Sequence, residues 1–226
     1  MPGRKIPLIT DHYYHIYNRG IDFRPIFSDK RGYQRFIKLL EYYRFANFPF
    51  SFSKLKRLSQ EDRGKLLQSL DKKNHTLIGI VCFCLMPNHF HLLVKQTQDD
   101  GVSWFVSQLQ NSYTKYFNKK HERVGPIFQS TFKSVLVENE QQLLHLSRYI
   151  HLNPYSAAMV KGFDQLISYP WSSLAVYLEK EKSQYQFCQT KTITSYFQGL
   201  KNYKKFLLDR ADYQKELEQI KHLTLE

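Results

Sequence analysis

The stretch IGIVCFCLMPNHFHLLV, residues 78–94, decides the fold. Residues 78–86 form an almost unbroken apolar run, and residues 89–94 form a second run of strand-favouring residues. Pro87 and Asn88 between the two runs are typical turn residues. The stretch therefore predicts a β-hairpin whose strands are largely buried.

Two histidines stand one residue apart in the second strand of this hairpin. Because successive side chains of a strand point to opposite faces, His89 and His91 share one face while Phe90 and Leu92 pack on the other. Two imidazoles on one face can converge on one metal ion. A His-x-His pair alone is more often an ordinary pair of strand histidines, so its meaning depends on the rest of the chain.

The composition is basic and aromatic. The 226 residues carry a formal net charge of +13 with a sequence pI near 9.5, and 15% of them are aromatic. Positive charge attracts a polyanion, and aromatic rings can stack on its bases, so the combination favours nucleic acid as a partner. A generally basic protein without such a partner would have the same charge.

Cysteine usage and hydropathy indicate the compartment. Cys82, Cys84 and Cys188 fit neither a disulfide framework nor a zinc pattern of the CxxC kind, and we expect Cys82 and Cys84 to be buried in a strand. The longest apolar run, residues 78–86, is too short to cross a bilayer, and residues 1–9 contain no apolar signal core. We therefore expect a cytoplasmic protein without a membrane partner.

Before the hairpin, residue spacing predicts one strand and one helix. The strand is expected over residues 12–18, and the helix follows with Ser28 as its N-cap. Residues 47–74 are polar and interrupt the pattern, so they are interpreted as an insertion with a short helix through residues 63–70.

After the hairpin, apolar residues three and four positions apart predict an amphipathic helix over residues 102–120. A strand is expected over residues 132–137. A further helix begins at Glu140, and Pro154 is expected to end or kink it near Asn153.

The order strand, helix, two strands, helix, strand is the ferredoxin-like pattern. It predicts an α+β fold in which an antiparallel sheet carries helices packed on one face, followed by one more helix. Two parts are expected: a domain over residues 11–160 with the insertion at about 47–74, and a helical C-terminal extension over residues 161–226.

The helix that begins at Glu140 places Tyr149 and Asn153 four residues apart and therefore on one face. If this helix packs beside the hairpin, Asn153 can supply a third ligand to a metal held by the two histidines, with the Tyr149 hydroxyl close by. A tyrosine is a competent nucleophile toward a phosphodiester that a metal polarises. Taken alone, Tyr149 also fits a core or surface tyrosine, and Asn153 fits a helix C-cap.

Three motifs, in this order, resemble those of the single-tyrosine HUH transposases, and most closely their REP-associated branch. They are HIYNRG at residues 15–20, MPNHFH at 86–91 and YIHLNP at 149–154. The resemblance covers roughly residues 11–171 and implies a ferredoxin-like HUH nuclease domain that binds hairpin-forming single-stranded DNA.

The resemblance also implies a role for each matching residue. His89 and His91 match the paired metal ligands, Tyr149 the attacking tyrosine and Asn153 the third ligand, with Mg²⁺ or Mn²⁺ as the cofactor. Attack by the tyrosine then gives a 5′-phosphotyrosine and a free 3′-hydroxyl, and a second 3′-hydroxyl reverses the step to join a new strand. Insertion-sequence members commonly have glutamine where Asn153 stands, which leaves element mobility and a swapped dimer open, so a monomer or a homodimer is expected.

DNA contacts are expected from the basic N-terminal segment and from the basic and aromatic stretch of residues 113–133. The candidates are Arg4, Lys5, Lys115, Lys119, Lys120, Arg123 and Lys133. His15 is a further candidate for the active site, although it equally fits a solvated strand residue, whereas His151 should point away from Tyr149.

Two other functions remain open at this point. Ferredoxin-like sheets also bind single-stranded nucleic acid without chemistry, so a non-catalytic single-stranded nucleic-acid-binding protein is the main alternative to an enzyme. A phosphodiesterase in which the metal activates water is the other, and it would cleave without a covalent adduct. Convergence of His89, His91, Tyr149 and Asn153 would favour the tyrosine enzyme, because a binding protein has no use for it.

Overall fold

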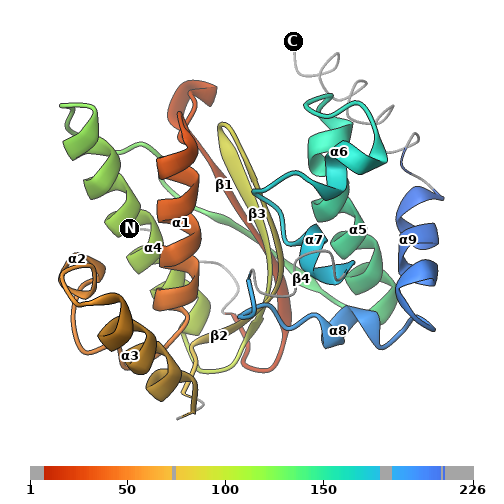
Figure 1. Cartoon of the computed structure of the whole chain (residues 1–226), viewed down its shortest axis with the longest axis horizontal. Coiled ribbons are helices and arrows are strands. Elements are labelled where there is room, and N and C mark those ends of the chain that lie inside the picture. Colours follow the sequence, from red (N-terminus) through yellow and green to blue (C-terminus); the bar gives the residue numbers. More distant parts are fainter. Residues whose placement is uncertain (1–7, 73–74, 179–184, 210, 212–226) are drawn as a thin grey trace.

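The structure is a computed structural model that describes residues 8–72, 75–178, 185–209 and 211. Figure 1 shows a central sheet with helices on both sides. None of the helices in the described part of the chain combines the length and the apolar character that a membrane span requires.

The described residues form a four-stranded sheet in the order β2-β3-β1-β4, and every neighbouring pair is antiparallel. This is the arrangement that the ferredoxin-like pattern predicts, and the fold class is confirmed. The strands are β1 (Tyr13–Arg19), β2 (Ile78–Met86), β3 (His89–Gln96) and β4 (Lys133–Val137).

The predicted hairpin is present. β2 and β3 pair from Met86 opposite His89 to Ile78 opposite Gln96, with one irregularity between Ile80 and Cys82. Every residue of β2 is buried. Cys82 and Cys84 are fully buried, as expected for strand residues between two helical layers.

The helices α1 (Lys30–Tyr43) and α4 (Gly101–Lys120) cover one side of the sheet, here called the α1–α4 face (Figure 1). Buried aromatic rings fill the interface: the ring of Phe36 lies 5.1 Å from that of Phe90 on β3 and 5.1 Å from that of Tyr113 on α4. Phe90 therefore points away from the face that its neighbouring histidines share, as the alternation of strand side chains predicts.

The N-cap of α1 is Asp29, and the prediction of Ser28 is wrong. The Asp29 carboxylate accepts a hydrogen bond from the Gly32 amide at 2.9 Å, whereas the hydroxyl of Ser28 lies 3.3 Å from the Nε2 atom of His121. Both residue types cap helices well, so the sequence alone could not separate the two neighbours.

The insertion contains two helices, α2 (Phe52–Leu55) and α3 (Gln60–Lys72), so the helical part is longer than the expected residues 63–70. Phe52 and Leu55 are buried in the core of the α1–α4 face. The insertion is therefore packed against the domain rather than extended from it.

The helix α5 (Glu140–Ser156) lies on the opposite side of the sheet, here called the α5 face. Of the two effects expected of Pro154, an end of the helix at Asn153 does not occur, and the C-cap is Ala157 rather than Asn153. A proline removes one amide hydrogen and crowds the carbonyl of the preceding turn. The Ala157 amide nevertheless donates to the Asn153 carbonyl at 3.0 Å, so the helix continues past Pro154. In the last turn one missing hydrogen bond is tolerated, and the helix continues to Ser156.

The C-terminal extension also covers the α5 face (Figure 1). A second cluster of buried residues joins Cys84 and Leu93 of the sheet to Ile150 on α5 and Tyr203 in the extension. The extension thus shares a core with the sheet and with α5. In the described part of the extension the helices are α6 (Phe163–Ile167), α7 (Leu174–Tyr177), α8 (Lys191–Thr194) and α9 (Leu200–Leu208).

Candidate active site

The sheet and α5 bring the two histidines of β3 next to Tyr149. The rings of His89 and His91 are 5.0 Å apart between centroids and nearly perpendicular, at 88°. The ring of Tyr149 lies 5.5 Å from that of His91, again edge-on at 86°. Both histidines therefore project onto the α5 face, where the helix presents its tyrosine.

Asn153 lies one turn beyond Tyr149 on the same helix, and its side chain is buried. It forms a side-chain hydrogen bond with His89. The structure thus places His89, His91, Tyr149 and Asn153 in one cluster, from residues that are far apart in the sequence.

The ring of His89 is held in one orientation by its neighbour in the hairpin turn. The Nδ1 atom lies 2.6 Å from the Oδ1 atom of Asn88, and since an amide oxygen only accepts, Nδ1 carries the proton. Burial, and secondarily the positive charge of Arg19, lower the pKa of His89 to about 4. The ring is therefore neutral at physiological pH, with a lone pair left on Nε2.

His15 on β1 contacts the second histidine. Its Nε2 atom lies 2.9 Å from the Nδ1 atom of His91, and the ring centroids are 5.1 Å apart. Burial lowers the pKa of His15 to about 4, so it is a neutral hydrogen-bond partner. If Nδ1 of His91 donates this bond, its Nε2 keeps a lone pair, which is the usual arrangement for a metal-binding histidine with an outer hydrogen-bond partner.

Two further residues of β1 belong to the cluster, and sequence reasoning did not select them. Tyr17 is directly opposite His91 and Arg19 directly opposite His89 in the antiparallel register. Directly opposite residues share a sheet face, and the ring of Tyr17 lies 5.8 Å from that of His91. Both residues belong to the HIYNRG motif at residues 15–20, and their place in this motif is the feature of the sequence that could have identified them.

The side chains of the cluster include donors that suit a divalent metal ion. No group of three or more His, Cys, Asp and Glu side chains in the described residues is arranged to hold one. The predicted set is of another kind, the imidazoles of His89 and His91 and the buried amide of Asn153. Neutral imidazole is the form that binds metals, and both rings have the outer hydrogen bonds that fix their orientation, so these residues fit a divalent ion.

His151 does not take part in the cluster. It is fully buried and lies within hydrogen-bond distance of the Tyr203 hydroxyl at 2.8 Å and the Ser173 hydroxyl at 2.9 Å. As expected, it points away from Tyr149, and it connects α5 to the C-terminal extension.

The basic residues proposed for DNA contact fall into separate regions. Lys133 on β4 is directly opposite Tyr17, so it shares the face of His91 and borders the cluster. Arg123 follows α4, donates to the Pro126 carbonyl at 3.0 Å and has its guanidinium 5.9 Å from the Phe117 ring. Arg4 and Lys5 lie outside the described residues.

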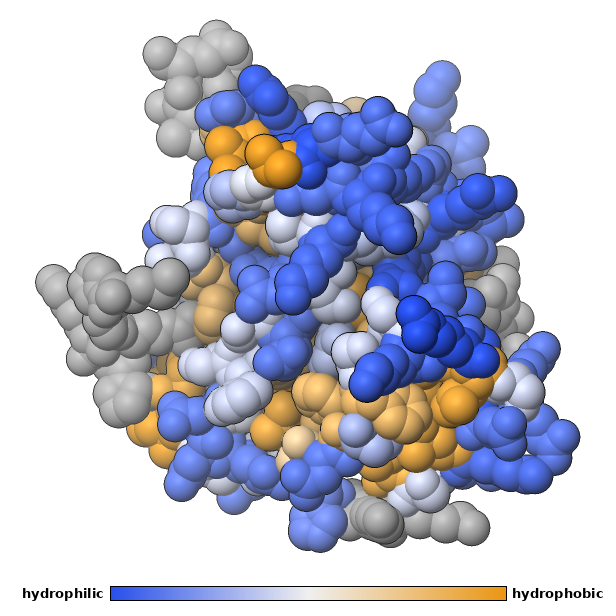
Figure 2. All heavy atoms as spheres, turned by 90° about the vertical axis from the view of Figure 1, so that its left-hand side faces the viewer, coloured by the Kyte–Doolittle hydropathy of each residue, from blue (hydrophilic) through white to orange (hydrophobic). Residues whose placement is uncertain are grey.

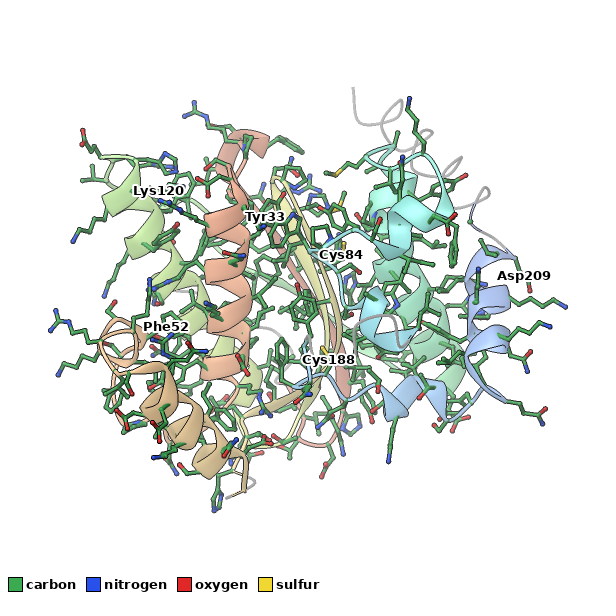
Figure 3. All side chains as sticks on the ribbon, in the orientation of Figure 1. Tyr33, Phe52, Cys84, Lys120, Cys188 and Asp209 are labelled. Atoms are coloured by element: carbon green, nitrogen blue, oxygen red, sulfur yellow. The ribbon has the colours of Figure 1, made fainter. Side chains whose placement is uncertain are left out.

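The other three lysines line a groove of about 850 Å³ on the opposite side of the molecule, between α1, α2 and α4. Figure 3 shows Lys120 at the end of α4 and Phe52 on α2, both on the side away from α5. Figure 2 views this side and shows hydrophilic side chains over most of it. Among the described residues, the cations that line the groove are Arg35, Lys56, Lys115, Lys119 and Lys120, with no acidic side chain in the lining.

Arg35 is built into the floor of this groove. Its guanidinium lies 4.3 Å from the centroid of the Phe52 ring and 5.3 Å from that of Tyr116. Its buried Nε atom has no hydrogen-bond partner. Burial lowers the pKa of Lys56, and the charges of Arg35 and its neighbours lower it further, so the groove holds positive charge that a bound anion would compensate.

The comparisons with known proteins bear on the fold and on the cluster. Residues 53–153 match the model of the family described as "Transposase IS200 like", a segment that contains the hairpin and ends at Asn153. No curated protein matches the sequence.

A solved structure is similar in fold. It is the structure of a REP-associated tyrosine transposase bound to a REP hairpin, with a TM-score of 0.50 and 15% sequence identity, covering 80% of this chain and 87% of that one. The family match covers residues 53–153, less than half of the chain, and the similarity to the solved structure is one of fold. Both agree with the resemblance of the three sequence motifs to the single-tyrosine HUH transposases.

Proposed function

We propose that the protein is a metal-dependent single-stranded DNA endonuclease and strand transferase that acts on hairpin DNA through a 5′-phosphotyrosine intermediate. The observation that carries the proposal is the position of the Tyr149 ring, 5.5 Å from that of His91, in one cluster with His89 and Asn153. A protein that only binds DNA gains nothing from this convergence.

Tyr149 is the nucleophile in this proposal. Its hydroxyl oxygen attacks the scissile phosphorus, a bond from phosphorus to the tyrosine oxygen forms, and the bond from phosphorus to the 3′ oxygen breaks. The phenol loses one proton and the leaving 3′ oxygen gains one, so the step is balanced. A second 3′-hydroxyl reverses it and joins a new strand, and because the phosphotyrosine keeps the bond energy, no nucleotide cofactor is needed.

His89, His91 and Asn153 would hold the metal ion, Mg²⁺ or Mn²⁺. When bound, such an ion offsets the charge that develops on the phosphoryl oxygens. His15 and Asn88 keep the two histidine rings in place through their ring-nitrogen contacts at 2.9 Å and 2.6 Å. They act as positioning residues.

Hairpin-forming DNA is the proposed partner. The similar solved structure is bound to a REP hairpin, and this chain is basic, with a net charge of +13. Lys133 and Arg19 lie on the face of the cluster and are placed to contact phosphates near the scissile bond. The groove lined by Lys115, Lys119 and Lys120 is on the opposite face and is proposed to contact DNA backbone remote from it.

One chain supplies all four residues of the cluster, so a monomer suffices for a complete site, although a homodimer is compatible with it.

We place the catalytic unit in residues 11–160 with the insertion at 47–74, and the supporting extension in residues 161–226. An enzyme that processes chromosomal DNA is expected in the bacterial cytoplasm.

The proposal is tested with labelled single-stranded hairpin oligonucleotides from the genomic flanks of the coding region, incubated with Mn²⁺ or Mg²⁺ and analysed on a denaturing gel. Wild-type protein should carry the label covalently, and Tyr149→Phe should not. Tyr155→Phe is the matched control, because it removes a hydroxyl from the same helix outside the cluster, and it should retain the adduct.

Other outcomes identify the alternatives. Cleavage by both wild type and Tyr149→Phe without an adduct would move the chemistry to a metal-activated water. Binding of the hairpin without cleavage under either metal would make the protein a non-catalytic single-stranded nucleic-acid-binding protein.

A further inference from the structure

The turn that follows β1 exposes a large aromatic ring next to the cluster. Phe23 is 63% exposed, far more than the phenylalanines of the core. It belongs to the short helical turn η1 (Ile21–Phe23) between β1 and α1.

The backbone of this turn is strained. Asp22 and Phe23 have φ angles of 54° and 57°, in the left-handed region that side chains other than glycine rarely adopt. Two such residues in succession persist only when the surrounding structure determines them, and they occur often at ligand-binding sites. Here the turn is tied to the hairpin, since the Gly20 amide donates to the Asn88 carbonyl at 2.7 Å and the Ile26 amide to the Pro87 carbonyl at 2.9 Å.

Asn88 and Arg19 link Phe23 to His89. The Asn88 side chain donates from Nδ2 to the Phe23 carbonyl at 3.1 Å, while its Oδ1 atom accepts from Nδ1 of His89 at 2.6 Å. The guanidinium of Arg19, which is directly opposite His89 in the register, lies 4.8 Å from the centroid of the Phe23 ring. One face of the ring is thus supported by a cation at the cluster, and the side chain remains mostly open.

We propose that Phe23 is a stacking platform for an unpaired nucleobase of the single-stranded DNA flank beside the scissile phosphate, with Arg19 contacting the adjoining phosphate. This inference rests on the proposed function and names the residues that hold the strand at that site. An exposed ring backed by a guanidinium offers a base the π surface and the backbone the positive charge that single-strand recognition uses. The strained turn and Asn88 fix the distance between this platform and His89.

The test compares the DNA affinities of protein variants for intact and abasic hairpins. All variants carry Tyr149→Phe and are measured without metal, so that binding is observed in the absence of cleavage. Fluorescein-labelled hairpins with single-stranded flanks are used, and one abasic nucleotide is moved stepwise along the flank. With Phe23 present, one position should lose affinity by about 5- to 150-fold when abasic, the range that stacking of one base gives. Phe23→Ala should lose a similar factor on the intact DNA and become insensitive to the abasic nucleotide at that position.

Two further variants separate stacking from structural effects. Phe23→Trp should retain affinity, and its indole fluorescence should change when the intact flank binds but not when the abasic one does. Trp104→Ala removes another exposed ring, 56% exposed on α4 of the opposite face, and should bind like the parent. Phe23→Ala with parental affinity, or an affinity loss that leaves the abasic effect intact, would overturn the platform.

The outcome is distinguishable from failure of the proposed function. If wild-type protein forms the phosphotyrosine adduct but Phe23→Ala binds and cleaves normally, only the platform is wrong. If neither protein binds any tailed hairpin, both proposals are wrong.

Discussion

The Nε2 atom of His15 lies 2.9 Å from the Nδ1 atom of His91, so the first strand of the chain holds the ring of a proposed metal ligand in the third. The two residues are 76 positions apart in the sequence. The contact exists because β1 pairs with β3 in a register that puts both side chains on the α5 face, with His15 opposite Leu93 and Tyr17 opposite His91.

Replacing His15 should weaken metal binding without removing a ligand. In His15→Phe the hydrogen bond to His91 is lost, and loss of such an outer partner typically costs about 10- to 100-fold in metal affinity or activity. His15→Gln can still accept a hydrogen bond and should lose less. The measurement is Mn²⁺ titration by calorimetry together with the rate of adduct formation.

A positioning role for His15 would be contradicted if both variants bound Mn²⁺ and formed the adduct like wild type. Equal and large losses in His15→Phe and His15→Gln would instead indicate that His15 itself binds the metal.

Removing charge from the groove between α1, α2 and α4 should change the salt dependence of DNA binding. Each phosphate contact contributes a slope of about −0.9 to the plot of log K against log salt concentration for duplex DNA. The double variant Lys115→Ala, Lys119→Ala should therefore reduce the slope by up to about 2, while the adduct rate at saturating DNA stays unchanged because the sheet separates the groove from Tyr149. The measurement is fluorescence anisotropy across a salt series.

The matched control is Lys201→Ala, which removes an exposed charge from α9 on the other side of the molecule. A slope that changes equally in this control would mean that only net charge matters, and an unchanged slope in the double variant would remove the groove from the DNA interface.

Gly20 should tolerate no side chain. A Cβ atom there would lie 2.2 Å from the Arg24 carbonyl oxygen and 3.0 Å from a methyl group of Ile26, so the turn after β1 would have to move. Gly20→Ala should lower the free energy of unfolding by about 1 to 3 kcal/mol, as overpacking does. Gly64→Ala is the control, because nothing lies within 4 Å of a Cβ atom added at Gly64. Alanine at this position of helix α3 should raise the free energy of unfolding slightly. Urea denaturation measures both, and equal stability of the two variants would contradict the close approach.

The sheet and the histidine pair could be predicted because they follow from local rules. Alternation in residues 78–94 fixes which side chains share a face, and helical spacing puts Tyr149 and Asn153 together. The end of α5 was not predicted correctly, because the effect of Pro154 depends on how many turns remain after it. Ser28 and Asp29 are both good caps, and only the folded backbone decides between them.

The rest of the cluster depends on the register between β1 and β3, which local sequence does not contain. Arg19 and Tyr17 face His89 and His91 only because the two strands pair in one of several alignments that alternation allows. Phe23 is placed by hydrogen bonds from a hairpin turn that lies 65 residues later in the chain. Long-range contacts of this kind appear in the structure alone.

Acid should destabilise the protein through His151, the buried histidine that joins α5 to Ser173 and Tyr203. Burial lowers the pKa of His151 to about 3 in the folded state, from a value of 6.5. The unfolded chain therefore takes up a proton below pH 6.5 while the folded chain does not. The contribution of His151 to the free energy of unfolding is therefore complete above pH 6.5. It is lost as the pH falls toward 3, by about 1.4 kcal/mol per pH unit, or about 2 kcal/mol at pH 5.

Urea denaturation of wild type and His151→Gln at pH 7.5 and pH 5 isolates this contribution. The glutamine variant keeps hydrogen-bonding atoms but has no group that titrates, so its free energy of unfolding should fall by about 2 kcal/mol less than that of wild type between the two pH values. Because His15 and His89 are present in both proteins, their own acid sensitivity cancels in the comparison. Equal losses in wild type and His151→Gln would mean that His151 is protonated in the folded state as readily as in the unfolded one.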